Sequence, residues 1–234
     1  AWFIVQGING RKSYLAILVI SFIGITSLII LQPDFGMTFL ISLVFFCQLF
    51  VAGLSLYLII FSFIMLIILS LGSYYYFDHV QKRIDLFLNP MSDSYQIDLS
   101  IQAFKSGGFF GKGPGQGTLK DKIPDANTDF IFAVAGEELG FIFCSLIILL
   151  ILTIIIRFLI KLLKIKDPFV IIATVGLTCC FGLQSLINIF SSLAIIPTKG
   201  MTLPFISYGG SSMVSSAILF GFLLSLTKNK IIYE

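Results

Sequence analysis

Two charged residues lie at the ends of apolar segments, where they are placed to do chemistry at a membrane surface. Asp129 is the last carboxylate before a long apolar run, and Lys199 lies in a short interruption between Pro197 and Pro204. A carboxylate partly buried at the boundary between water and lipid can act as a general base, and an ammonium group facing a cavity can hold a pyrophosphate. The simpler interpretations are that Thr128 or Asp129 caps a helix and that Lys199 is a membrane anchor.

A glycine-rich stretch supplies a second set of candidates. Residues 107–117 read GGFFGKGPGQG and contain six glycines. Backbone N–H groups of such a stretch can cradle a phosphate, and Lys112 and Lys120 would then help to bind a phosphate-bearing substrate. No predicted strand precedes the stretch and no Gly-Lys-Ser/Thr sequence closes it. A flexible or tightly turning loop is therefore the more economical interpretation.

Polar residues also occur inside two apolar segments. Glu137 and Glu138 lie in the run after Asp129, about 12 Å further along an uninterrupted helix. Carboxylates within a membrane are costly, and they mark the interior of a helix bundle, a transport path or a proton site. Gln184 and Asn188 are four residues apart on one face of a later helix. We interpret these two amides as candidate partners of the carboxylates.

The elements that must position these residues are membrane helices. Of the 234 residues, 57% are hydrophobic and 12% are charged, which excludes a soluble single domain, a disordered chain and a nucleic-acid-binding protein with a basic surface. A helix needs about 20 apolar residues to cross a bilayer. The sequence therefore predicts an all-α, polytopic membrane protein with a single membrane domain. Its six transmembrane helices are expected at residues 14–31, 36–53, 55–77, 130–156, 169–196 and 206–227.

The distribution of Lys and Arg predicts the orientation. Eight basic residues at the ends of the predicted helices fall on one side, which the positive-inside rule makes cytoplasmic. They are Arg11, Lys12, Arg157, Lys161, Lys164, Lys166, Lys228 and Lys230, whereas Lys199 lies on the outer side. Both ends of the chain are then cytoplasmic, and residues 78–128 form a long extracytoplasmic loop. In this loop, residues 79–88 predict an amphipathic helix on the membrane surface, whereas residues 95–102 fit either a strand or a helix. Asp34, in a short outer connection, is most simply a turn residue.

Three segments resemble the signature segments of the SEDS family (shape, elongation, division and sporulation). They read LQPDFG at 31–36, GGFFGKGPGQGT to IPDANTDFIFAVAGEELG at 107–140, and IPTKGMTLPFISYGGSS at 196–212. The last segment resembles the cell-division branch of the family more than its elongation branch. The resemblance covers nearly the whole chain and implies a ten-helix membrane enzyme. This chain would hold its last six helices and would be inactive without the first four.

The resemblance also implies a function. Such an enzyme is a peptidoglycan glycosyltransferase of the bacterial inner (cytoplasmic) membrane that polymerises lipid II at the division septum. It works with a class B penicillin-binding protein, a transpeptidase, and with other division proteins. The family's proposed catalytic aspartate corresponds to Asp129, and its Pro-Thr-Lys-Gly lysine corresponds to Lys199. Asn127 stands where the family usually has His, so it can orient a neighbour by hydrogen bonding but cannot share a proton.

These observations predict a mechanism. Asp129 would take the proton from a sugar hydroxyl that attacks a second, lipid-linked sugar. Lys199 or a divalent cation such as Mg²⁺ or Mn²⁺ would offset the charge of the undecaprenyl pyrophosphate that leaves. The sequence shows no set of protein ligands for a metal. The four cysteines lie in apolar runs and predict neither a metal site nor disulfides.

Two other functions remain open from the sequence. A lipid II flippase needs polar groups at the middle of the membrane, and the polar residues inside the predicted helices could line such a path. They are Glu137, Glu138, Gln184 and Asn188. A non-catalytic scaffold for division proteins would need none of the candidate residues for chemistry.

Overall fold

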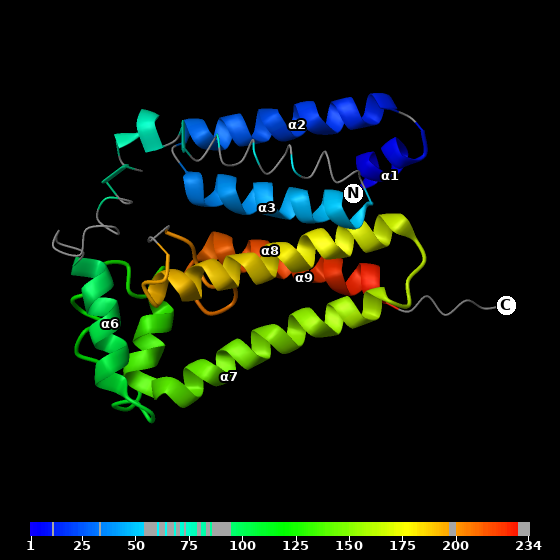
Figure 1. Cartoon of the computed structure of the whole chain (residues 1–234). Helices are drawn as coiled ribbons and strands as arrows, with labels where there is room; N and C mark the ends of the chain where they lie inside the picture. The colour runs from blue at the N-terminus through cyan, green and yellow to red at the C-terminus, as the bar shows by residue number, and fades with distance from the viewer. Residues whose placement is uncertain are drawn as a thin grey trace. The chain divides into compact units, whose positions relative to one another are not determined.

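In the part of the chain that it describes, the computed structural model consists of helices joined by turns and loops, without strands. The described residues are 1–10, 12–32, 34–53, 60, 64, 68, 71–72, 74–78, 81–82, 85, 95–196 and 200–228. The helices are α1 (Trp2–Ile8), α2 (Lys12–Leu31), α3 (Phe35–Val51), α6 (Tyr95–Gly107), α7 (Ile131–Leu162), α8 (Pro168–Ser192) and α9 (Gly210–Thr227) (Figure 1). Most of the predicted span 55–77, most of the predicted surface helix 79–88, and Lys199 lie outside the described residues.

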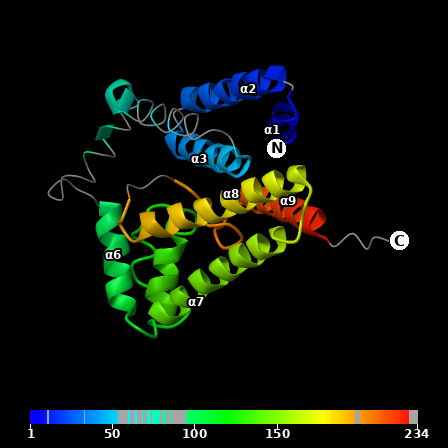
Figure 2. The same ribbon diagram turned by 45° about the vertical axis from the view of Figure 1, so that its right-hand side comes forward.

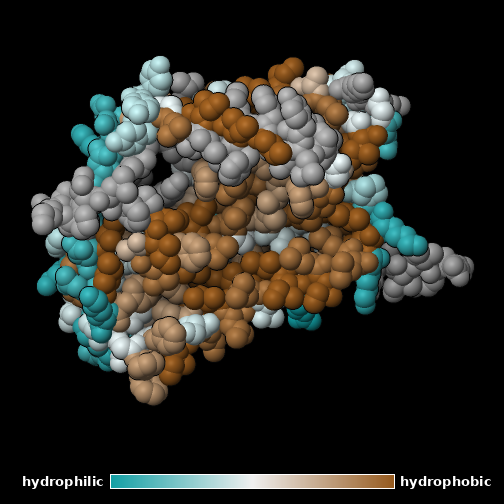
Figure 3. Space-filling model, in the orientation of Figure 1, coloured by the Kyte–Doolittle hydropathy of each residue, from teal (hydrophilic) through white to brown (hydrophobic). Residues whose placement is uncertain are grey.

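Four of these helices, α2, α7, α8 and α9, are long and apolar enough to cross a membrane. Helix α3 is also apolar but shorter. Hydrophobic side chains cover much of the long helices, whereas hydrophilic ones gather around α6 (Figure 3). The prediction of an all-α membrane protein is confirmed. The predicted number of six spans stays a prediction, because the third of them is largely outside the described residues.

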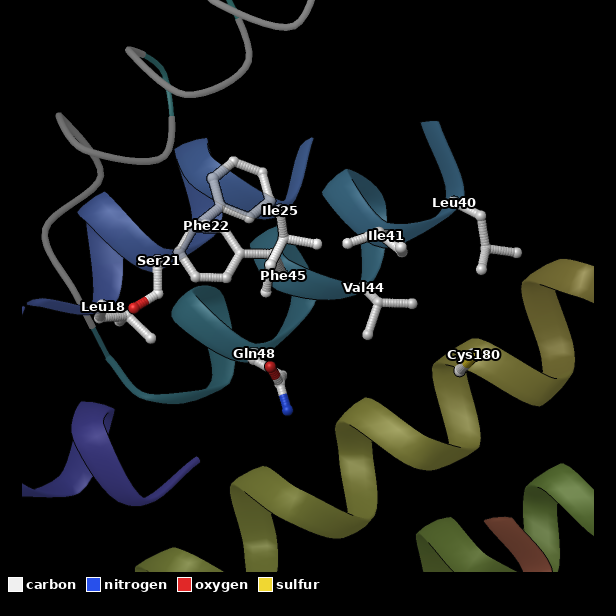
Figure 4. A pocket seen from close by; sticks show the side chains of 10 residues that line it. All are labelled: Leu18, Ser21, Phe22, Ile25, Leu40, Ile41, Val44, Phe45, Gln48 and Cys180. Atoms are coloured by element: carbon white, nitrogen blue, oxygen red, sulfur yellow. The ribbon is translucent and has the colours of Figure 1, made fainter. Parts of the chain in front are cut away.

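The chain divides into two compact units, of which residues 1–70, 154–181 and 215–234 form the first. Its core joins Ile4 of α1, Leu49 of α3 and Ile172 of α8. The amide of Gln48 donates a hydrogen bond to the Ile172 carbonyl at 3.2 Å. A largely apolar cavity of about 250 Å³ lies among α2, α3 and α8 of this unit (Figure 4). Asp34 does more than make a turn, since its carboxylate caps α3 by accepting from the Met37 N–H at 3.0 Å.

Residues 71–153 and 182–214 form the second unit. Here residues 95–107 form the helix α6, so the strand interpretation of residues 95–102 is wrong. Leu99, Ala103 and Gly107 are buried at intervals of four residues, which is the spacing of one helix face. Leu99 and Ala103 share a core with Phe130, which directly precedes α7, and with Ala133 in its first turn. Only a helix places these residues on one face, so this packing explains why residues 95–102 form a helix and not a strand.

The helix α7 is broken at Gly140, where φ is 79° and ψ is −179°. The part after the break, residues 141–162, is about 33 Å long and can cross the bilayer core alone. The interpretation of residues 130–156 as one uninterrupted span must therefore be corrected. Glu137 and Glu138 precede the break, so they need not be placed in the hydrocarbon.

Candidate functional site

The break in α7 leaves two N–H groups that need acceptors from outside the helix. In an uninterrupted helix, the N–H groups of Phe141 and Ile142 would donate to the carbonyls four residues earlier. Instead, Phe141 donates to the carbonyl of Gly108 at 2.9 Å, and Ile142 donates to that of Phe109 at 3.3 Å. Both acceptors belong to the glycine-rich loop, which lies beside the start of α7 (Figure 1, Figure 2). The loop therefore supplies what the broken helix has lost.

The same loop also satisfies the carbonyls that the break leaves free. The carbonyl of Glu137 accepts from the N–H of Lys112 at 3.0 Å, and the carbonyl of Glu138 accepts from the N–H of Gly113 at 2.9 Å. Every backbone group that loses its helical partner at these positions thus gains one from the loop. Irregular backbone beside a membrane is tolerated only under this condition.

Three glycines make the close approach between loop and helix possible. A Cβ atom added at Gly107, Gly111 or Gly140 would overlap backbone atoms of the opposite segment. Gly111 and Gly140 also have positive φ values of 77° and 79°, which favour glycine. The interpretation of residues 107–117 as a tightly turning loop describes this arrangement. A phosphate cradle would need free backbone N–H groups, but those of Lys112, Gly113 and Gly115 already donate to Glu137 and Glu138.

The carboxylate of Glu137 is fully buried and is held by the loop. It accepts hydrogen bonds from Lys112 Nζ at 2.7 Å, from the Thr118 N–H at 3.0 Å and from the Leu119 N–H at 3.1 Å. A buried charge is tolerated when it is paired and hydrogen-bonded in this way. The interpretation that Gln184 and Asn188 are partners of the carboxylates is wrong, since the loop provides the partners.

Glu138 makes a second, more accessible set of contacts with the loop. Its carboxylate accepts from Lys120 Nζ at 2.9 Å and from the Gly115 N–H at 2.8 Å. The hydrogen bond to Glu138 raises the pKa of Lys120, which keeps its ammonium group charged at neutral pH. Lys112 and Lys120, predicted to contact substrate, are therefore both in ion pairs with carboxylates of α7.

The segment 127–129, which ends in the proposed base Asp129, is held at all three of its carbonyl oxygens. The Asn127 carbonyl accepts from the Tyr208 N–H at 2.9 Å. The Thr128 carbonyl accepts from Ser207 Oγ, and the Asp129 carbonyl accepts from Asn188 Nδ2 at 2.8 Å. The donors come from the segment before α9 and from α8, far away in the sequence. The sequence motif at 196–212 contains Ser207 and Tyr208, but nothing in their types or spacing indicates that they bind this segment.

The residues after Lys199 lie beside the Asp129 carboxylate. A Cβ atom added at Gly200 would be 3.4 Å from Asp129 Oδ2. Asn188, which is 1% exposed, also donates to the carbonyl of Met201 and so binds both segments at once. The structure therefore brings Asp129 together with the chain that directly follows Lys199, within one unit.

The other predicted polar residues have local partners in the same unit. Gln184 Nε2 donates to the carbonyl of Thr202 at 3.1 Å, and the Thr202 hydroxyl contacts the Ser212 hydroxyl at 2.7 Å. The Thr128 hydroxyl donates to the carbonyl of Asp125 at 3.1 Å. Since α7 begins at Ile131, the interpretation of Thr128 as the cap of this helix is not supported.

A cavity of about 410 Å³ opens next to segment 127–129. Its lining combines polar groups with apolar ones from the beginnings of α7 and α9. The lining residues are Asn127, Ile131, Ile206, Ser207, Tyr208, Gly209, Gly210 and Met213. Asn127, which replaces the expected His, is exposed there and can offer an amide to a polar ligand.

A metal site made of protein ligands alone is not evident in the described part of the chain. None of its His, Cys, Asp and Glu residues form a group of three or more that could hold an ion. A single carboxylate such as Asp129 could still share a cation with ligand oxygens, as is usual for Mg²⁺.

Comparison with known proteins identifies the family. The profile of the FtsW/RodA/SpoVE cell cycle proteins matches residues 1–231. The chain belongs to this family. The resemblance to SEDS proteins that the three sequence segments carry is thereby confirmed.

Relatives named probable peptidoglycan glycosyltransferase FtsW are similar over most of the chain. The protein from Caulobacter vibrioides is 44% identical over 210 residues, covering 87% of this chain and 53% of the relative. The protein from Trichlorobacter lovleyi is 35% identical over 223 residues, covering 93% and 58%. The chain thus spans about half the length of these FtsW relatives.

A solved structure supports the fold. A chain from a peptidoglycan synthase complex that coordinates polymerization and crosslinking has a TM-score of 0.71 and 22% identity, covering 94% of this chain and 64% of that chain. At this identity, the likeness shows a shared fold.

Proposed function

We propose that this chain is part of a peptidoglycan glycosyltransferase that polymerises lipid II into glycan strands during cell division, with Asp129 as the general base. FtsW relatives that bear this activity in their names support the proposal. The membrane helices agree with a substrate that carries a lipid. We place the enzyme in the bacterial inner membrane, at the septum, with both ends of this chain in the cytoplasm.

One observation carries the assignment of Asp129. Its segment is bound at three consecutive carbonyls by groups from α8 and from residues 207–208. A general base must be held within hydrogen-bond reach of the proton that it removes. Backbone contacts of this kind fix the position of the segment, and a cavity lined in part by Asn127 opens next to the segment.

The proposed reaction joins two lipid-linked sugars. A hydroxyl of one sugar forms a bond to the anomeric carbon of the other, while the bond from that carbon to the phosphate oxygen breaks. Asp129 accepts the hydroxyl proton, and undecaprenyl pyrophosphate leaves with the bonding electrons. Lys199, which precedes Gly200, is proposed to offset the charge on this leaving group.

A divalent cation such as Mg²⁺ or Mn²⁺ is a second means of neutralising the pyrophosphate. In the absence of a protein ligand set among the described residues, substrate phosphates would hold most of its coordination sphere, with Asp129 as the proposed carboxylate ligand. When bound, such a cation supplies positive charge to the departing phosphate.

The expected partners follow from the family. A class B penicillin-binding protein would crosslink the glycan strands that this enzyme makes, and other division proteins would bring both to the septum. The similar fold of a chain in a peptidoglycan synthase complex supports a partner of this kind.

The test uses the full-length protein with its transpeptidase partner in lipid vesicles that contain lipid II. We expect Asp129→Asn to lower the rate of polymerisation by about 10²- to 10⁴-fold, as for the loss of a general base, and Lys199→Ala to lower it as well. Asp125→Asn, an exposed neighbour in the same turn, is the matched control. Wild-type rates in both Asp129→Asn and Lys199→Ala would refute the assignment.

A flippase is supported less well. Such a protein needs polar groups that are available to the passing headgroup, whereas each of the four intramembrane candidates has partners inside the protein. Glu137 and Glu138 bind the loop, Gln184 binds Thr202, and Asn188 binds Asp129 and Met201. A flippase predicts that Glu138→Gln stops translocation while Asp129→Asn spares it, so a translocation assay separates the two functions.

A further inference from the structure

Two aromatic side chains point away from the protein at the tip of the glycine-rich loop. The exposed fraction is 69% for Phe109 and 85% for Phe110. Large exposed aromatic side chains that lie next to each other usually mark an interaction surface. Neither side chain has a role in the site around Asp129.

The backbone that carries this pair is fixed. The carbonyls of Gly108 and Phe109 accept hydrogen bonds from N–H groups of α7, and the N–H of Gly111 donates to the carbonyl of Gly107 at 2.8 Å. Gly108 and Gly111, on either side of the pair, have φ values of 57° and 77° that other residues rarely adopt. The backbone that carries the two rings therefore cannot fold inward without breaking the hydrogen bonds that the loop makes with α7.

The pair is continuous with the apolar surface of α7. The ring of Phe109 contacts that of Phe141 edge to face, with 6.0 Å between centroids. Phe141 and Ile142 are 63% and 52% exposed and begin the part of α7 that is long enough to cross the bilayer. We call Phe109, Phe110, Phe141 and Ile142 the loop patch.

Charges of the neighbouring loop do not interrupt this surface. The ammonium groups of Lys112 and Lys120 in this loop are bound to Glu137 and Glu138. The loop therefore presents an apolar tip beside two neutralised ion pairs. This combination suits a site where water gives way to lipid.

We propose that the loop patch is a membrane anchor, with Phe109 and Phe110 inserted into the lipid hydrocarbon at the level where residues 141–162 enter it. Aromatic side chains are favoured at this boundary. An anchored tip would fix the depth of the glycine-rich loop, and with it the depth of the short helical part of α7 before Gly140. The inference concerns the place of the loop in the bilayer and does not depend on the proposed function.

Tryptophan fluorescence in proteoliposomes tests this anchor. This chain contains one tryptophan, Trp2. In the full-length protein, with Trp2 and any tryptophan outside this chain replaced by Phe, Phe110→Trp gives a single reporter with an aromatic ring at the tip. In phosphatidylcholine vesicles whose acyl chains are brominated near the glycerol, we expect the reporter to lose about half of its fluorescence, because bromine quenches tryptophan on contact and interfacial groups insert about 5–10 Å. Acrylamide in the water should quench it weakly.

The control reporter lies in the same loop, away from the patch. In the same background, Gln116→Trp places the ring at an exposed polar position, where acrylamide should quench strongly and brominated lipid weakly. Phe109→Trp provides a second reporter within the patch. If the reporters at 109 and 110 are as accessible to acrylamide as the one at 116 and are not quenched by brominated lipid, the patch is in water and the proposal is wrong.

Discussion

Glu137 is the residue whose burial depends most on its neighbours. Its carboxylate is fully buried, and one lysine and two backbone N–H groups bind it. Without these partners the buried carboxylate would lack compensation, which costs far more than the net value of an ion pair. The position therefore acts as the attachment point between the loop and α7.

We expect Glu137→Ala to lower the free energy of unfolding by about 3–5 kcal/mol, because the Thr118 and Leu119 N–H groups then lose their acceptor at about 1–3 kcal/mol each. Glu137→Gln keeps an acceptor for the Thr118 and Leu119 N–H groups, so its effect should be smaller. Thermal unfolding in detergent measures both. Lys120→Met, at the more accessible pair, is the control and should change stability by about 1 kcal/mol or less. An equal effect of all three variants would contradict this account of the buried carboxylate.

Asn188 is the residue that joins the two halves of the candidate site. It donates to the carbonyls of Asp129 and Met201. Leucine at this position would leave both carbonyls without this donor, at a cost of about 1–3 kcal/mol for each buried group.

Asn188→Leu should therefore reduce stability and should also lower the polymerisation rate at temperatures where the variant stays folded. Thr153→Val, an exposed residue that bonds only to its own helix, is the control for the loss of a polar group from a membrane helix. A folded Asn188→Leu protein with wild-type activity would show that Asp129 does not need this contact.

At the scale of elements, hydropathy predicts the long helices but not the break in α7. Gly140 lies in a run whose apolar composition continues on both sides, so an average over the window does not register it. The break depends on the loop at 108–113, which supplies hydrogen bonds from more than twenty residues away in sequence. The sequence does contain one signal: two lysines in the loop are matched by two glutamates in the following helix.

Glycine substitutions test how the loop and the broken helix fit. Gly140→Ala should destabilise the protein by more than about 1–3 kcal/mol, the cost of a strained backbone. The φ of 79° and ψ of −179° at Gly140 lie in a region that essentially only glycine adopts, and a Cβ would also overlap the loop backbone. Gly115→Ala is a matched control: its φ of 78° is nearly the same as the 79° of Gly140, but a Cβ there meets no atom within 4 Å. The difference between the two variants in thermal unfolding reports the overlap together with the cost of the ψ of −179° at Gly140. Equal losses would mean that the close approach is not needed.

At the scale of the whole molecule, composition and basic residues predict a multi-pass membrane protein, and the family agrees. The site could be predicted only in part. The sequence indicates Asp129 and the segment around Lys199 because each is a polar interruption between apolar runs. It cannot indicate that Asn188, Ser207 and Tyr208 bind segment 127–129, because the acceptors are backbone carbonyls, which every residue type has.

The dependence of the polymerisation rate on pH tests the role of Asp129 most directly. A general base must be ionised, so the rate of the full-length enzyme should fall as the pH is lowered through the pKa of that base. We predict that Asp129→Asn abolishes this acidic limb and leaves a slow, pH-independent rate, while Asp125→Asn keeps the wild-type profile. An Asp129→Asn enzyme that retains the acidic limb would contradict the assignment, because another group would then be the base.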